Sequence, residues 1–192
     1  MRNERTMLLM LLTAMFFTLH SQAQSEFQVN KEKSKLEIQG TSSIHDWEMV
    51  VEDYQLKTNL TATNENTTTI NRVSFSCKVE DITADNRIMD GKAHKALKED
   101  EHPRILFTII EDSSIEIKDG KTYIKGSLTI AGVTRKIQFP VSIQMLSDSA
   151  FQVKGELSLR MTEYNVTPPK AMMGALETGD EITIDIDLLL EQ

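Results

Sequence analysis

Alternation of apolar and polar residues is the feature that most constrains the fold of this chain. Near the C-terminus, an apolar residue occupies every second position of 182–190, and the polar residues Thr183, Asp185 and Asp187 stand between them. Successive side chains of a β-strand point to opposite faces of the sheet, so this pattern predicts a strand with one apolar face. The same period recurs in residues 73–79, 105–109, 133–143 and 151–159. The chain is therefore predicted to be all-β.

Short turn signals separate these runs. Asp119-Gly120 lies between two of them and predicts a two-residue hairpin, because glycine accepts the positive φ that such turns require. Ala131-Gly132 is predicted to form a second hairpin. Short strands joined by tight turns form an antiparallel meander, and closing the meander into a barrel removes its exposed edges. A β-sandwich remains the alternative.

Three segments depart from the alternating pattern. In residues 86–98, apolar residues recur with the spacing of one helical face: Met89, Ala93, Ala96 and Leu97. This spacing predicts a short α-helix, with Asp90 as a cap of its first turn. Residues 61–69 are rich in Thr and Asn and are predicted to form a hairpin tip, and residues 161–180 are predicted to form a long loop.

The N-terminal 23 residues have the pattern of a cleavable secretory signal. Arg2 and Arg5 precede the apolar run 7–19, and a small-x-small cleavage site ends at Ala23. The alternative is a membrane anchor, but a helix of about 13 residues spans only about 20 Å of the roughly 30 Å hydrocarbon core. We expect a signal peptide at 1–23, a single domain at 24–192, no stable membrane anchor, and a periplasmic or secreted location.

The composition excludes some partners and some means of stabilisation. The formal net charge of −8 argues against binding to nucleic acid or to anionic membrane surfaces. The single cysteine rules out an internal disulfide. A domain of this size needs none, because about 170 residues can bury about 70% of the surface of their unfolded chain.

The residues offer little support for catalysis. We find no nucleotide-binding loop, nucleophile elbow or paired-cysteine metal site. His94 and His102 lie among acidic residues that could hold a divalent metal, but their spacing matches no standard ligand motif. The alternation around Cys77 directs its thiol inward, away from the accessible setting that a nucleophile needs. We predict no catalytic residue, no metal and no enzymatic activity; a metal-dependent enzyme that uses His45, His94 and His102 is the least favoured alternative.

The interior of the predicted barrel is the remaining candidate site. An antiparallel barrel of about eight strands is either filled by its own side chains or wide enough for one small ligand. The inward-facing residues are almost all Ile, Leu, Val and Phe, so such a ligand would have to be apolar. Periodicity alone leaves the filled and the hollow barrel equally open.

Three segments resemble a known family. They are residues 123–141 (YIKGSLTIAGVTRKIQFPV), residues 102–107 (HPRILF) and residues 179–182 (GDEI). In this order they are similar to the YceI-like family of periplasmic polyisoprenoid-binding proteins, over roughly residues 34–190. The resemblance implies an eight-stranded antiparallel lipocalin-like barrel with one short α-helix, whose cavity holds an isoprenoid chain. Residues 43–47 and 168–174 depart from the family pattern, and we expect the mouth of the cavity to differ there.

The leading hypothesis is a protein that sequesters or carries one long apolar lipid inside the barrel. The candidate ligands are an isoprenoid quinone, a polyprenyl lipid or a fatty acyl amide, and no other cofactor is expected. A filled barrel that serves as a protein-interaction module is the alternative, and a homodimer stays open. The predicted ligand contacts are Phe75, Cys77, Ile105, Phe107, Ile109, Leu128, Ile130, Ile137, Phe139, Val153, Leu157 and Ile184.

Overall fold

The computed structural model describes residues 27–64, 67–109, 115–118, 120–171 and 176–192. The predicted signal peptide and the start of the predicted domain lie outside these residues. In the described part, no helix is long and apolar enough to cross a membrane.

Over the described ranges the chain forms β-strands, as the alternation predicts, and one short α-helix. The helix is α2 (Arg87–Ala96), and short 3-10 turns are η1 (Lys31–Lys33), η2 (Val79–Asp81) and η3 (Met161–Tyr164). The strands are β1 (Gln28–Val29), β2 (Lys35–Ser42), β3 (Trp47–Val51), β4 (Tyr54–Asn64), β5 (Thr67–Lys78), β6 (Ile82–Thr83), β7 (Arg104–Ile109), β8 (Ile115–Lys118), β9 (Lys121–Ile130), β10 (Val133–Ser147), β11 (Ala150–Arg160), β12 (Lys170–Ala171) and β13 (Leu176–Glu191).

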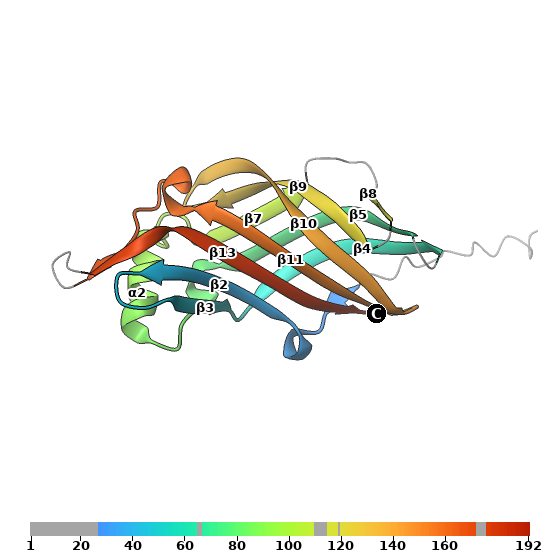
Figure 1. Ribbon diagram of the computed structural model, residues 1–192, viewed down its shortest axis with the longest axis horizontal. Coiled ribbons are helices and arrows are strands. Elements are labelled where there is room, and N and C mark those ends of the chain that lie inside the picture. Colours follow the sequence, from blue (N-terminus) through green and yellow to red (C-terminus); the bar gives the residue numbers. More distant parts are fainter. Residues whose placement is uncertain (1–26, 65–66, 110–114, 119, 172–175) are drawn as a thin grey trace, which may run out of the picture.

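All strands belong to a single, strongly curled antiparallel sheet (Figure 1). Its order is β4-β5-β7-β9-β10-β11-β13-β2-β3-β6, with β1 and β12 paired to β13 and β8 paired to β5 and β9. The lipocalin-like barrel is confirmed in its curvature and strand direction, and the sandwich alternative is wrong. Among the described residues, the hydrogen-bonded order runs from β4 to β6 without returning to β4, so the barrel is incomplete.

The expected count of eight strands is wrong, because the sheet has thirteen strands in the described part of the chain. The additional strands include β1, β6, β8 and β12, each of two to four residues. A strand of two residues is too short to display a period, so alternation cannot reveal it.

The tight turns fall where the glycines predicted them. Ala131 and Gly132 have φ angles of 47° and 78°, and Val133 pairs with Ile130 across them. Gly120 has a φ of 69°, and Lys118 pairs with Lys121. Strands β8 and β9 are therefore paired on either side of Gly120, and Asp119 of the predicted turn lies outside the described residues.

Helix α2 forms where its apolar spacing predicts it, but its cap is not the residue expected. The Asn86 side chain is the N-cap and accepts hydrogen bonds from the backbone N–H groups of Ile88 and Met89. Asp90 instead accepts a hydrogen bond from the backbone N–H of Ala84, at 2.7 Å. This hydrogen bond links α2 to the segment just before it. The prediction of Asp90 as the cap is therefore wrong.

The predicted hairpin tip at 61–69 and the predicted loop at 161–180 both contain more strand than expected. Strand β4 continues to Asn64 and β5 begins at Thr67, so the expected tip at 61–69 is mostly paired strand. Threonine is β-branched and fits a pleated strand well, which explains the pairing. Within 161–180, η3 and β12 interrupt the expected loop, and β13 already begins at Leu176.

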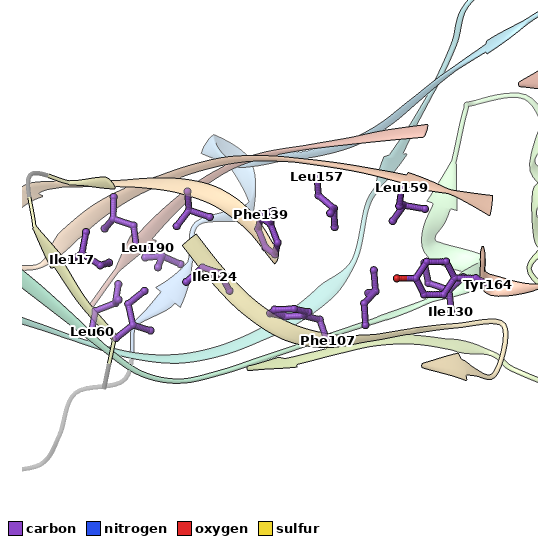
Figure 2. Packing of buried hydrophobic residues seen from close by; sticks show 14 of the residues in the cluster. Leu60, Phe107, Ile117, Ile124, Ile130, Phe139, Leu157, Leu159, Tyr164 and Leu190 are labelled. Atoms are coloured by element: carbon purple, nitrogen blue, oxygen red, sulfur yellow. The ribbon is translucent and has the colours of Figure 1, made fainter. Parts of the chain in front are cut away.

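Several of the most deeply buried side chains gather at one end of the barrel. Phe27, Ile117, Phe151 and Leu190 are at most 2% exposed, and the rings of Phe27 and Phe151 meet edge to face at 5.1 Å. Figure 2 shows Leu60, Ile117, Ile124 and Leu190 gathered at this end, with Phe107, Phe139 and Leu157 farther along the barrel. We call the end at Phe27, Ile117, Phe151 and Leu190 the packed end; α2 lies at the opposite end (Figure 1).

The outer face of β2 and β3 carries a carboxylate pair that predicts a pH-dependent stability. The hydrogen bond and like charge of Glu37 raise the pKa of Glu48, while the Lys35 ammonium lowers the pKa of Glu37. A carboxyl group whose pKa is higher in the folded than in the unfolded state stabilises the fold at pH values below its unfolded pKa of about 4.3. This contribution is lost as the pH rises through the folded-state pKa.

We therefore expect Glu48→Gln to raise the free energy of unfolding relative to the wild type at pH 7, and to lose this advantage at pH 4. Urea denaturation at both values measures the difference. Glu101→Gln removes the same charge from an exposed site in the turn after α2 and serves as the control. An advantage of Glu48→Gln that is equal at both pH values would contradict the assignment.

Candidate functional site

A cavity of about 550 Å³ lies inside the curled sheet. This volume is within the range of small-molecule binding sites in proteins. Strands β2, β3, β4, β5, β7, β9, β10, β11 and β13 all contribute side chains to its wall, and so does α2. Because alternate residues of each strand point inward, the strands that show the clearest period supply most of the lining.

The predicted contact residues come together around this cavity, with one exception. Ile109 packs against the core and does not line the cavity. The lining residues among those predicted are Phe75, Cys77, Ile105, Phe107, Leu128, Ile130, Ile137, Phe139, Val153, Leu157 and Ile184. That they contact a ligand stays a prediction.

The wall is apolar and uncharged along most of its length. Cys77 is buried between β4 and β7, opposite Tyr54 and Ile105. Burial raises the pKa of its thiol to about 12, so the group is neutral at physiological pH. The inward position that the sequence predicts for Cys77 is confirmed, and the thiol behaves as a small apolar group of the wall.

The cavity reaches the surface at the α2 end. Its exposed lining residues are His45, Asn86, Ile88, Lys92, Lys170 and Glu177, from the β2–β3 connection, α2 and the β12–β13 region. We call this set the mouth. The β2–β3 connection and β13 are tied together there, because the Glu177 backbone N–H donates to Ser43 Oγ at 3.1 Å and Ser43 N–H donates to the Glu177 carbonyl at 3.0 Å.

Both segments that depart from the family pattern contribute to the mouth. His45 and Trp47 lie in 43–47, and Pro169 and Lys170 lie in 168–174, of which residues 172–174 are outside the described part. Lys170 also forms an ion pair with Glu177. The sequence departures therefore coincide with the opening of the cavity.

Sequence reasoning missed several lining residues. Met89 and Ala93 on α2 line the cavity, and their helical spacing was the available signal. Trp47 also lines it, and its indole N–H donates to the Thr41 carbonyl at 3.0 Å. The ring lies over Gly40, where a Cβ atom would come within 2.2 Å of it, so the cross-strand glycine makes room for the indole.

Each of the three histidines of the metal hypothesis contacts a different part of the chain. His94 Nε2 lies 2.8 Å from the Ile82 carbonyl, and His45 Nδ1 lies 2.7 Å from the Asp46 carbonyl. The ring of His102 lies over Gly132 in the β9–β10 turn. Across the described ranges, no group of three or more His, Cys, Asp or Glu residues could hold a metal ion.

The burial of Cys77 predicts a slow reaction with thiol reagents. At pH 8, a thiol of pKa about 12 is roughly one ten-thousandth thiolate, whereas a free cysteine near pKa 8.5 is about one quarter thiolate. We expect labelling by a disulfide reagent to be at least about a thousandfold slower in the folded protein than in 6 M guanidinium chloride. Rapid labelling of the folded protein would show an accessible thiol instead.

Solved structures share the fold of this chain. A crystal structure of Burkholderia cenocepacia BcnA has a TM-score of 0.66 at 15% identity, covering 84% of this chain and 99% of that one. A polyisoprenoid binding domain from Saccharophagus degradans, implicated in plant cell wall breakdown, has a TM-score of 0.61 at 12% identity, covering 86% and 97%. The Campylobacter jejuni YCEI protein has a TM-score of 0.62 at 15% identity, covering 75% and 84%.

The sequence itself matches a family model over most of its length. No curated protein matches the chain. The model of the YceI-like domain matches residues 11–190, which include every strand and helix described above except the last residue of β13. The chain therefore belongs to the YceI-like domain family.

Proposed function

We propose that this protein binds one long apolar lipid of the isoprenoid or fatty acyl class in its cavity and carries or stores it outside the cytoplasm. The observation that carries this proposal is the cavity itself, which is apolar along its wall and open at the mouth. Binding requires no reaction, and the lipid would leave unchanged.

The physical driving force is the removal of apolar surface from water. Burial contributes about 25 cal/mol per Å², so a lipid chain that buries several hundred Å² gains on the order of 10 kcal/mol before the cost of ordering it. The inward side chains of the strands supply apolar contacts, so binding of the hydrocarbon part of the lipid does not require a polar group of the protein.

Two further observations support the class of ligand and the location. The Saccharophagus degradans domain of similar fold is named for polyisoprenoid binding, which is a property of that protein and favours the same class here. The N-terminal pattern of two arginines, an apolar run and a small-x-small site favours export of this chain. A lipid in an aqueous compartment needs such a protein to shield it from water.

The alternative of a filled barrel accounts less well for the interior. Phe27 and Phe151 pack together at the packed end, but the cavity extends from α2 as far as Leu60, Ile124 and Leu190. A protein-interaction module would gain nothing from this space, since an unfilled apolar cavity forfeits packing contacts and lowers stability.

Extraction of the protein tests the proposal. The exported protein is purified from its natural host and extracted with organic solvent, and the extract is analysed by mass spectrometry. We expect about one apolar molecule per protein, or its restoration when the stripped protein is incubated with membrane lipid. Failure to find a stoichiometric lipid in either sample would refute the proposal.

Neighbouring residues of β7 provide a matched pair of variants. Ile105 lines the cavity, whereas Leu106 is 43% exposed on the other face of the same strand. We expect Ile105→Trp to occupy part of the cavity and to reduce the amount of bound lipid severalfold, and Leu106→Trp to leave it unchanged. Mass spectrometry of extracts from both variants gives the comparison, and equal retention by the two variants would place the lipid elsewhere.

A further inference from the structure

One polar group lies inside the apolar wall and has no partner. Tyr164 is 1% exposed, and its ring lines the cavity. Its hydroxyl oxygen is buried without a hydrogen-bond partner; of the three side chains with such an atom among the described residues, Tyr164 alone lines the cavity. In Figure 2 its hydroxyl is directed along the barrel interior, beside Leu159 and Ile130.

An unpartnered buried hydroxyl is unfavourable in the free protein. Buried polar groups in proteins almost always have a hydrogen-bond partner, and leaving one unpaired costs the free energy of its desolvation. Burial also raises the pKa of the Tyr164 phenol, so the group is protonated at neutral pH and can donate its proton to an acceptor.

The backbone holds Tyr164 in a fixed position. It ends η3, where Val166 N–H donates to the Met161 carbonyl at 3.1 Å and Asn165 adopts a left-handed φ of 54°. The Asp180 carboxylate of β13 accepts hydrogen bonds from the Thr162 backbone N–H at 2.9 Å and the Thr162 hydroxyl at 2.7 Å. The turn is thereby attached to the longest strand of the sheet, and the phenol is oriented before any ligand arrives.

The surroundings of the hydroxyl restrict the kind of acceptor. Its neighbours in the core cluster are apolar, and the lysines that line the cavity, Lys92 and Lys170, are exposed at the mouth. Arg135 on β10 is also exposed, and its effect on the pKa of the Tyr164 phenol is smaller than the opposite effect of Glu163. A phosphate or carboxylate beside Tyr164 would therefore be a buried anion without a buried cation, which is strongly unfavourable. A neutral carbonyl oxygen accepts the same hydrogen bond without that cost.

We propose that the Tyr164 hydroxyl is a polar subsite of the cavity, which selects neutral apolar ligands that carry a carbonyl-type oxygen over pure hydrocarbons and charged lipids. The inference rests on the proposed function and adds the chemical class of the ligand. The carbonyl end lies at Tyr164, and the hydrocarbon extends past Phe107 and Phe139 toward the packed end. Apolar neighbours cover the hydroxyl, so the acceptor displaces one of them; Met161 lines the cavity in the same turn and has a flexible side chain suited to this movement.

Two probes that differ only in the carbonyl oxygen test the subsite. The first is farnesylacetone, a neutral isoprenoid ketone, and the second is the same chain with a methylene group in place of the carbonyl oxygen. Trp47 is the single tryptophan of the chain and lines the cavity, so its fluorescence reports the binding of either probe. Tyr164→Phe keeps the ring and removes the hydroxyl. Tyr123→Phe removes a hydroxyl from the outer face of β9, where Tyr123 is 59% exposed, and is the control.

We expect Tyr164→Phe to weaken binding of the ketone about 5- to 10-fold, the equivalent of one hydrogen bond, and to change binding of the hydrocarbon less than twofold. Tyr123→Phe should bind both probes like the wild type. An equal loss for both probes, or no loss for the ketone, would overturn the subsite while leaving the lipid-binding proposal in place. If the wild-type protein binds neither probe, both proposals fail.

The stability of the lipid-free protein gives a second, independent readout. Because Tyr164→Phe removes an unpaired polar group, it should resist urea better than the wild type when no ligand is present, and the ketone should stabilise it less. A lower stability of lipid-free Tyr164→Phe would show that the hydroxyl already has a partner in the free protein, and would overturn the inference.

Discussion

The pairing of β13 with its neighbours is the constraint on which the rest of the structure depends. This strand pairs with β11 from Glu181 to Glu191 and with β2 from Thr178 to Asp187, and it also holds β1 and β12. A barrel with a cavity lacks the packing contacts of a filled core, so the backbone ladder bears more of the stability. The attachment of η3 to Asp180 places Tyr164 from the same strand.

The strong period of the long strands made most of this architecture predictable. A residue such as Ile184 or Ile137 has polar neighbours on both sides, so its inward direction follows from the geometry of a strand alone. The same logic predicted the lining residues of the cavity, and helical spacing predicted α2. The N-cap of α2 was harder to predict, because Asn86 and Asp90 are both residue types that can accept hydrogen bonds from the backbone.

Other features depend on distances that a period does not encode. Alternation shows which face of a strand is apolar, but it does not show whether the inward side chains pack against one another, as Phe27 and Phe151 do, or line a cavity. Two-residue strands such as β6 form because their neighbours bring them into register. The subsite proposed at Tyr164 also required the structure, since Tyr54 is another buried tyrosine but lies outside the cavity lining.

For the lipid carriage proposed above, a cavity that opens at the α2 end would determine the order of events in exchange. A long guest would enter with its hydrocarbon tail leading, and its last atoms would remain near α2 and the β2–β3 connection. A donor of the guest and an acceptor would then approach the same surface. They could not occupy it together, so the proposed exchange would take place in two separate encounters.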